Sequence, residues 1–543
     1  RRRVDPVVSS DVGSPGFEAR SPGDLAPQPP RGWLGGRGFA RAALLAVVFV
    51  CAACGLVYEL ALVSLGSYLI GNTATQASIV LSVMVFAMGV GSLAAKPLQR
   101  HATIAFAVIE LSLALLGGLS VMALYWAFAY LELYTPALVV VAFVLGLLIG
   151  AEIPLLMVLL QKIRRQDAGS AVADMFAVDY IGALVGGLCF PFLLLPWFGQ
   201  LRGAIIVGLV NAVAGCFLVF VVFRRSLRPP VATMLGAGAA AVIVVLVAAL
   251  VLSGRFEVTA RQALFRDPIV AAERTPYQDI VITERQTSAG PDTRLFLNGD
   301  LQFSSIDEYR YHEALVHPAQ IHPGDSVLIL GGGDGLALRE VLAYPDVRAA
   351  TLVELDPEMI SLARHDRRLR TLNRGSMSDP RATIVAADAF SWLRKSRQLY
   401  DVIIIDMPDP DESATAKLYS VEFYALAKAH LAVGGRMVVQ AGSPYFAPRS
   451  FWCIVATLRA ADLHTIPYHV DVPSFGDWGF VLASDSPVWP TMYQKHPPLR
   501  FLTEDVLTAA TTFPKDRDKL DVPASTLMDP RILRYAQSEW SLY

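Results

Sequence analysis

Long apolar stretches fill residues 40–253 of this 543-residue chain and constrain its fold more than any other feature. A helix that crosses a bilayer needs about 20 mostly apolar residues. Seven stretches meet this requirement, near residues 42–66, 76–95, 102–128, 136–160, 175–198, 204–223 and 231–252. We therefore predict a multi-span α-helical membrane domain of about seven helices, in a multi-pass protein of the cell membrane that contacts the lipid bilayer.

The rest of the chain has the composition of a disordered or soluble protein. Residues 1–39 are rich in Pro, Gly, Ser and Arg and are predicted to form a disordered tail. Residues 257–304 are predicted to form a small β domain, residues 305–490 a Rossmann-like domain, and residues 491–543 a C-terminal tail. The formal net charge of -2 gives no basic surplus, and no nucleic-acid partner is expected.

Small and acidic residues stand out inside the apolar stretches. Gly89 with Gly91, and Gly182 with Gly186, are spaced to let helices pack closely in lipid. Cys51 and Cys54 are expected to be small packing residues, and no metal site is expected. Acidic side chains are costly in a bilayer and therefore suggest a function; they are Glu59, Glu110, Glu152, Asp174 and Asp179. They either bind polar partners and fix the bundle, or serve the passage of a substrate.

The soluble half alternates strands with helices. Asn298-Gly299 predicts a hairpin turn in a small antiparallel sheet. Buried strands are then predicted at Val327–Leu330, Ala350–Val353, Thr383–Val385, Val402–Ile405 and Met437–Val439. This pattern indicates an α/β doubly wound, methyltransferase-type sheet, whose ligand lies beyond the carboxyl ends of the strands.

A glycine-rich loop follows the first of these strands. Gly331, Gly333 and Gly335 allow the backbone to approach a ligand and turn into a helix. Glu354 ends the next strand, where a carboxylate accepts both ribose hydroxyls of a nucleoside, or else caps a helix. Asp334 would repel a pyrophosphate and favours a cationic ligand instead.

Two further strand ends carry acidic residues. Asp388, followed by Ala389, lies where this fold can bind an adenine amino group. Asp406 and Asp409 stand in a proline-rich loop, and two such close carboxylates call for a cation, such as a diamine. The alternative is a turn with two solvated acids.

These segments together resemble spermidine synthase, the polyamine aminopropyltransferase. The matching stretches are Tyr277-Gln278, Leu297-Asn298-Gly299 with Gln302, Asp307-Glu308, Tyr311-His312-Glu313, Gly331 to Gly335 with Arg339-Glu340, Glu354, Asp388-Ala389 and Asp406 to Pro410. The apolar half and the C-terminal segment with Trp540 resemble the membrane-bound branch of that family.

The resemblance implies a reaction and a role for each matching residue. Decarboxylated S-adenosylmethionine is the implied co-substrate, no bound cofactor is implied, and putrescine would be converted into spermidine and methylthioadenosine. The implied nucleoside-binding residues are Gln278, Asp334, Glu354, Asp388 and Ala389. The implied amine-binding residues are Tyr311, His312, Asp334, Asp406 and Asp409, with Asp406 as the catalytic acid-base residue. A homodimer or homotetramer is also implied.

Two departures from the family pattern concern the acceptor amine. Soluble relatives have Gly-Pro after the acidic loop and a tyrosine before the last strand, where this chain has Asp411-Glu412-Ser413 and Phe475. Two other functions stay open: a methyltransferase on the same fold, and a polyamine- or nucleoside-binding transporter or sensor.

Loop charges and substrate supply predict opposite orientations. Lys and Arg cluster before the first span and after the second, fourth and sixth, which places the N-terminus inside and, with seven spans, the soluble half outside. The implied donor is made in the cytosol, and we expect a catalytic domain on the cytoplasmic side.

Overall fold

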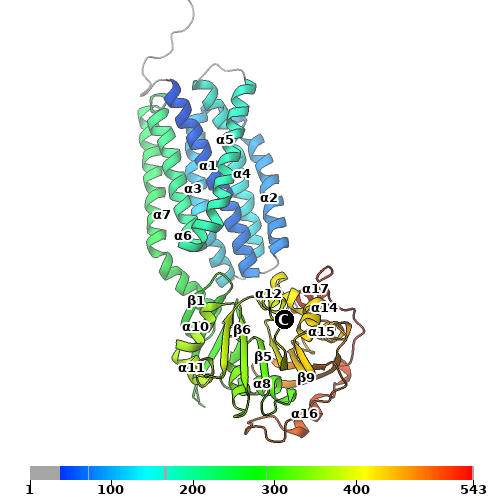
Figure 1. Cartoon of the computed structure of the whole chain (residues 1–543). Helices are drawn as coiled ribbons and strands as arrows, with labels where there is room; N and C mark the ends of the chain where they lie inside the picture. The colour runs from blue at the N-terminus through cyan, green and yellow to red at the C-terminus, as the bar shows by residue number, and fades with distance from the viewer. Residues whose placement is uncertain (1–36, 71–72, 132, 164–167, 289, 541–543) are drawn as a thin grey trace, which may run out of the picture.

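The computed structural model describes residues 37–70, 73–131, 133–163, 168–288 and 290–540. The disordered tail predicted for residues 1–39 lies outside this range except for residues 37–39. An N-terminal helical bundle stands on an α/β half, and the chain enters the bundle at the end remote from that half (Figure 1).

Long helices make up the N-terminal half. They are α1 (Arg37–Ile70), α2 (Thr73–Ala94), α3 (Ala102–Trp126), α4 (Tyr134–Ile163), α5 (Ala168–Cys189), α6 (Leu195–Phe217) and α7 (Pro229–Leu264). Among the described residues, six continuous helical segments are long and apolar enough to cross a membrane, one fewer than the seven predicted. The difference arises at Val172–Val222, where α5 and α6 belong to one apolar helical segment.

That segment folds back on itself. Gly199 has φ 71° and ψ 178°, which breaks the helical path. α5 runs in the direction of α1, because Gly182 meets Phe49 and Gly187, further along α5, meets Leu56. α6 runs the other way: Gln200 donates to Ser64, and the later Val207 accepts from Cys54. The α/β half therefore lies at the opposite end of the bundle from Arg37.

Close helix contacts depend on particular glycines. A Cβ added to Gly91 would lie 1.9 Å from the carbonyl oxygen of Leu147, and one added to Gly182 would lie 2.3 Å from that of Phe49. Gly186 is similarly close to Ala53. The prediction was wrong for Gly89, which has open space around its Cβ position.

A four-stranded antiparallel sheet follows the bundle. Its strands are β1 (Ile269–Arg274), β2 (Asp279–Thr287), β3 (Gly290–Leu297) and β4 (Asp300–Ser304), in that order. Asn298 (φ 53°) and Gly299 (φ 99°) form the predicted turn between β3 and β4. The strands begin later than residue 257 because α7 continues to Leu264. Gln262 joins the two elements: its amide donates to the carbonyl of Asp267 and accepts from the N–H of Ile269.

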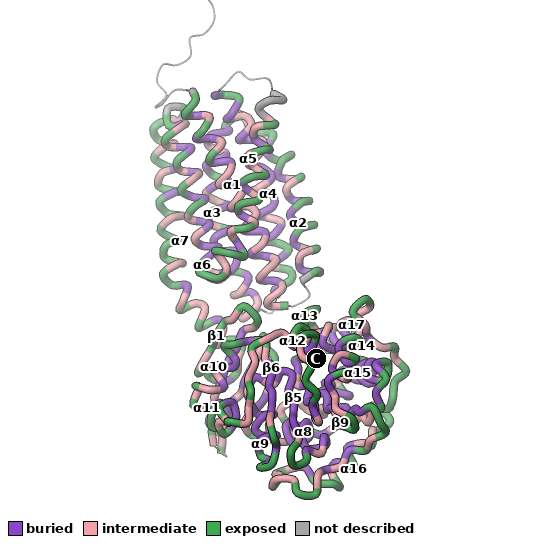
Figure 2. The backbone as a smooth tube through the Cα atoms, viewed as in Figure 1, coloured by how far each residue is buried: buried purple, intermediate pink, exposed green. Residues whose placement is uncertain are grey.

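The last part of the chain is built on a mixed seven-stranded sheet of order β10-β11-β9-β8-β5-β6-β7. The strands are β5 (Ser326–Gly331), β6 (Ala349–Glu354), β7 (Ala382–Ala386), β8 (Tyr400–Asp406), β9 (Leu431–Gln440), β10 (His464–Val472) and β11 (Gly476–Ser484). β5 to β9 are parallel, as predicted for a doubly wound sheet, and buried residues run through its central strands (Figure 2).

Helices cover this sheet and extend to the C-terminus. They are α8 (Glu308–Val316), α9 (Leu336–Leu342), α10 (Pro357–His365), α11 (Arg367–Leu372), α12 (Ala389–Lys395), α13 (Ser413–Ala416), α14 (Val421–Lys428), α15 (Pro448–Ala460), α16 (Glu504–Ala510) and α17 (Arg531–Trp540). The segment predicted as a C-terminal tail thus contains α16 and α17. Glu539 of α17 accepts hydrogen bonds from the N–H groups of Arg449 and Ser450, at the start of α15.

Candidate active site

The carboxyl ends of neighbouring parallel strands bring the predicted site together. Gly331 at the end of β5 is in register with Asp406 at the end of β8. β6, which ends at Glu354, pairs with β5 on its other side. Three segments far apart in sequence therefore meet at one edge of the sheet, where a doubly wound fold binds its ligands.

The glycine loop after β5 lies against both carboxylates. Gly331 has φ 83°, and an added Cβ would be 2.0 Å from the carbonyl oxygen of Asp406. An added Cβ on Gly333 would lie 2.6 Å from Oε2 of Glu354. Gly335 has φ 81°, a left-handed conformation that favours glycine. A side chain at Gly331 would therefore displace the main chain at Asp406, and one at Gly333 would displace the Glu354 carboxylate.

Glu354 and Gln278 meet through a residue that the sequence analysis missed. The Asp356 carboxylate accepts from the Gln278 amide at 3.0 Å, while the Asp356 N–H donates to Oε1 of Glu354 at 2.9 Å. Burial raises the pKa of Glu354 to about 7, and the charges of Asp356 and Asp334 add to the rise. In the sequence, only the position of Asp356, two residues after Glu354, could have indicated its role.

The Asp406 carboxylate is held in place through one of its two oxygens. The Tyr311 hydroxyl donates to Oδ1 of Asp406 at 2.6 Å. Oδ2 faces the glycine loop, because a Cβ on Gly332 would lie 3.0 Å from it. Burial raises the pKa of Asp406 to about 6; the charge of His312 opposes the rise and that of Asp334 adds to it. The structure thus joins Tyr311 and Asp406, two of the predicted amine-binding residues.

His312 is fixed by a buried network behind this site. Its Nδ1 lies 2.9 Å from Oε2 of Glu308, whose carboxylate is also bound by both terminal nitrogens of Arg339, at 2.8 and 2.9 Å. Burial lowers the pKa of His312, but contact with the Glu308 carboxylate raises it overall. Burial also raises the pKa of Asp334, whose Oδ1 accepts from the N–H of Leu336.

The Asp409 carboxylate is held by Gln440 and not by Tyr311, the residue that holds Asp406. The Gln440 amide donates to its Oδ1 at 3.1 Å and also to the Tyr419 hydroxyl at 2.8 Å. Burial, together with the charges of Asp411 and Asp300, raises the pKa of Asp409 to about 7. Gln440 lies at the end of β9, and only its place at a strand end could have indicated it.

The Asp388 carboxylate binds residues outside the glycine loop. It caps α12 by accepting from the N–H of Ser391, and its other oxygen accepts from Nζ of Lys417 at 2.9 Å. Partial burial would raise the pKa of Asp388, but these contacts with Lys417 and Ser391 lower it. Ala389 is the buried first residue of α12. Among the described residues, neither Asp388 nor Ala389 forms a side-chain hydrogen bond with another of the predicted site residues.

Aromatic side chains surround Tyr311 on the side of the last strands. The Phe475 ring lies 6.0 Å from that of Tyr311 and 5.1 Å from that of Trp478. Trp540 of the C-terminal helix lies 6.2 Å from Trp478. Aromatic faces attract cations, so these rings and the acids suit an organic ammonium ligand. Trp478 was missed because only the fold brings it near Tyr311.

Comparisons with known proteins show the family of this chain. Residues 308–494 match the family model of the spermine/spermidine synthase domain. Polyamine aminopropyltransferase 1 of Streptomyces coelicolor is 61% identical over 507 residues, which cover 93% of this chain and 96% of that protein. Polyamine aminopropyltransferase of Mycobacterium tuberculosis H37Rv is 48% identical over 512 residues, covering 92% and 97%. A spermidine synthase crystallised with a transition-state analogue is 28% identical, with a TM-score of 0.42, over 51% of this chain and 89% of its own.

Proposed function

Because this chain belongs to the polyamine aminopropyltransferase family, we propose that it transfers the aminopropyl group of decarboxylated S-adenosylmethionine to putrescine, as a membrane-bound spermidine synthase. The observation that carries the proposal is the set of buried acids around the glycine loop. Burial raises the pKa of Glu354, Asp334, Asp406 and Asp409. A donor with a sulfonium and an ammonium group, and an acceptor diamine, would supply the missing positive charge.

The donor is assigned to the glycine-loop side. Glu354 would accept hydrogen bonds from the ribose hydroxyls, and Gln278 would support it through Asp356. Asp334 would attract the donor's amine tail. Asp388 and Ala389 remain assigned to the adenine end, and Asp388 would offer the lone pairs that Ser391 and Lys417 leave free.

Asp406 would accept the proton of the attacking amine. A primary amine has a pKa of about 10 and is mostly protonated at neutral pH. Asp406 would take one proton from this ammonium. The freed lone pair of the nitrogen then forms a bond to the aminopropyl carbon while the carbon–sulfur bond breaks, and the electron pair of that bond leaves with a neutral thioether. Tyr311 holds Oδ1, so Oδ2 of Asp406 is the oxygen placed to orient the amine and take its proton. His312 and Asp409 would help to hold the acceptor.

The decisive experiment uses the full chain purified in detergent. It is supplied with decarboxylated S-adenosylmethionine and a panel of amines, with products identified by mass. We expect spermidine and methylthioadenosine in equal amounts from putrescine. Transfer to another amine but not to putrescine would overturn the acceptor assignment. Methyl transfer from S-adenosylmethionine would favour the methyltransferase, and polyamine binding without turnover the transporter or sensor.

We further propose that the catalytic half faces the cytosol, where its donor is made. Lys96, Lys162 and Arg224, basic loop residues that the structure describes, lie at the remote end of the bundle and favour the reverse orientation. The part of the chain at the catalytic end also contains arginines, however: Arg202 near the start of α6, Arg255 and Arg261 in the last third of α7, and Arg266 and Arg274 after it. A reporter fused after Tyr543 that is active only outside the cell would contradict the proposal.

A family resemblance also suggests a homodimer or homotetramer. Light scattering of the purified protein, corrected for bound detergent, would measure the state, and a monomeric mass with full activity would contradict it.

A further inference from the structure

A buried polar cluster lies inside the membrane bundle, away from the site described above. Cys51 of α1, Glu110 of α3 and Glu152 of α4 place one sulfur and two carboxylate oxygens within 4.8 Å of one another. Asn211 of α6 completes the cluster, donating from Nδ2 to Oε2 of Glu110 at 2.8 Å. The sulfur of Cys51 lies 3.5 Å from the same oxygen. Four helices thus meet at one polar point.

The protein does not neutralise this cluster with a cation of its own. Among the described residues, neither Glu110 nor Glu152 forms an ion pair; Arg41 pairs with Asp174 nearer the remote end of the bundle. An ionised carboxylate taken out of water without a partner costs several kcal/mol or more. The two acids are therefore either protonated or neutralised by a bound cation.

Unpartnered oxygen atoms distinguish these two states. Asn211 is 1% exposed and its amide is turned towards Glu110, yet its Oδ1 has no hydrogen-bond partner among the described residues. Oε1 of Glu110, equally buried, also has none there. A buried polar atom without a partner is costly in lipid, where no water replaces it. A proton shared between Glu110 and Glu152 would satisfy those two acids, but it leaves the amide oxygen of Asn211 without a partner in this arrangement, whereas a bound cation would satisfy it.

We propose that Cys51, Glu110, Glu152 and Asn211 form a binding site for a divalent metal ion of the Zn²⁺ class. A thiolate, two carboxylates and an amide oxygen supply four ligands, the usual number for Zn²⁺. The thiolate favours Zn²⁺ over the hard ions Mg²⁺ and Ca²⁺, which prefer oxygen alone. Tetrahedral coordination separates ligand atoms by about 3.5 Å, so the Cys51, Glu110 and Glu152 side chains would close in by about 1 Å. The Asn211 amide, whose Nδ2 now faces Glu110, would rotate to present its oxygen to the ion.

The metal would join α1, α3, α4 and α6 in the middle of the bundle. Binding requires the thiol and any protonated acid to lose their protons, so the ion replaces protons at the cluster. This role is independent of aminopropyl transfer at the other end of the molecule. It also differs from the sequence-based expectation, in which Cys51 is only a packing residue.

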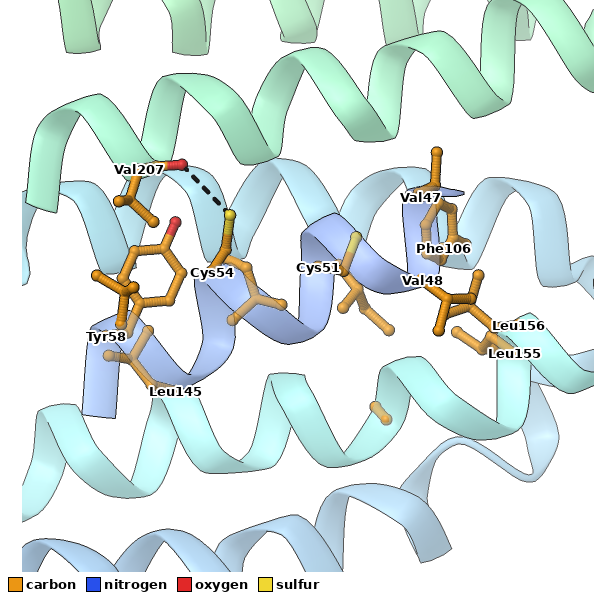
Figure 3. Packing of buried hydrophobic residues seen from close by; sticks show 14 of the residues in the cluster. Val47, Val48, Cys51, Cys54, Tyr58, Phe106, Leu145, Leu155, Leu156 and Val207 are labelled. Atoms are coloured by element: carbon orange, nitrogen blue, oxygen red, sulfur yellow. Dashed lines mark hydrogen bonds between the residues drawn. The ribbon is translucent and has the colours of Figure 1, made fainter. Parts of the chain in front are cut away.

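Cys54 provides a matched control. It lies on α1 one turn from Cys51, and its sulfur contacts the carbonyl oxygen of Val207 at 3.8 Å (Figure 3). Cys54 is buried to the same degree as Cys51, at 4% and 3% exposed, but is not in the cluster. The two serine variants therefore remove equivalent thiols from the same helix.

The test uses the full chain in detergent, stripped with a chelator and then dialysed against Zn²⁺ or Co²⁺. We expect about one ion per chain by elemental analysis, and a thiolate-to-cobalt charge-transfer band. Cys51→Ser should abolish the band and Cys54→Ser should keep it. Glu152→Gln should weaken Zn²⁺ binding by at least about tenfold and remove the rise in Tm that Zn²⁺ gives the wild type.

Several results would overturn the proposal. One is less than about a tenth of an equivalent of either ion in the folded wild-type protein, which would mean that protons alone occupy the cluster. Another is a cobalt band that survives Cys51→Ser. If that variant does not fold, an unchanged Zn²⁺ affinity in Glu152→Gln would refute the site.

Discussion

The hydroxyl of Tyr68, at the end of the first bundle helix, donates a hydrogen bond to the Asp279 carboxylate at the start of β2, over 2.6 Å. Arg261 of α7 lies 3.6 Å from the other oxygen of Asp279, and the Arg274 guanidinium lies 4.8 Å from the centre of the Tyr68 ring. Asp279 follows Gln278 directly. Helices α1 and α7 therefore hold the start of β2, directly after Gln278, which is proposed to bind the donor.

Tyr68→Phe should raise the KM for the donor by about threefold to tenfold, the usual effect of losing one hydrogen bond. The acceptor KM and kcat should change little, because the glycine loop and Asp406 are not in this contact. Steady-state kinetics in detergent would measure the split. Tyr130→Phe at the same end of the bundle, where the ring is 47% exposed, is the control and should resemble the wild type.

Glu354→Gln should weaken nucleoside binding by roughly 1–3 kcal/mol, because charged hydrogen bonds to the ribose would be impaired. Calorimetry with methylthioadenosine measures the loss, and affinity for the acceptor should be unchanged. Unaltered methylthioadenosine affinity would remove Glu354 from the site.

Asp406→Asn should lower turnover by roughly 10² or more, the usual contribution of a positioned base. The shape is kept, but the proton acceptor is lost. Asp409→Asn is the comparison: it should mainly raise the acceptor KM, since Asp409 is proposed to hold a cation. Wild-type turnover in Asp406→Asn with every active amine would rule out the mechanism given above.

Acidification should lower activity but stabilise the ligand-free catalytic half. The pKa of Asp406 is about 6, so kcat/KM should fall below that pH as the base becomes protonated. The pKa values of Glu354 and Asp409, about 7, are raised by burial, so the folded state binds more protons than the unfolded state between about pH 4 and 7. Stability should therefore fall as pH rises through this window.

Thermal unfolding at pH 5 and pH 7 would check the predicted effect on stability, and we expect the Tm to be higher at pH 5 by about 3 °C or more. Glu354→Gln, which carries no titrating carboxyl at that position, should show a smaller difference. A Tm that increases with pH in the ligand-free wild type would contradict this assignment of the burial effect.

The helical segments should behave as integral membrane elements. Alkaline carbonate strips proteins held by surface charge but leaves buried apolar spans in place, so the protein should stay in the membrane pellet. Immunodetection in pellet and supernatant would decide. Release into the supernatant is incompatible with a transmembrane bundle.

The sequence predicted those elements of the fold that depend on local residue patterns. The strand predicted at Val327–Leu330 is β5, Ser326–Gly331, because a fully buried parallel strand is a short continuous apolar run. The spans predicted near 175–198 and 204–223 correspond to α5 and α6, because the reversal at Gly199 falls in the gap between them; the continuous helical segment Val172–Val222 joins the two. The sheet start failed because α7 outlasts its apolar run and ends with polar residues such as Gln262.

In the site, too, local features were predictable and contacts between distant segments were not. Glycines and acids at strand ends were predictable, since the carboxyl edge of a parallel sheet gathers them. The pair between Glu308 and Arg339 joins residues on two helices, α8 and α9, and nothing local in either segment reveals it. Asp388 shows the converse: its strand-end position suggested a ligand role, while Ser391 and Lys417 already occupy its two oxygens.

Gln262 restricts rotation between α7 and β1, because this residue of α7 makes two amide hydrogen bonds to the backbone that begins β1. The bilayer plane would therefore fix the tilt of the catalytic half and hold the donor-binding side of its site, around Gln278 and Glu354, close to the lipid headgroups. Polycations concentrate at an anionic lipid surface. An enzyme anchored in this way would draw its amines from a thin interfacial layer, so its apparent saturation in vesicles should depend on lipid charge as well as on bulk amine concentration.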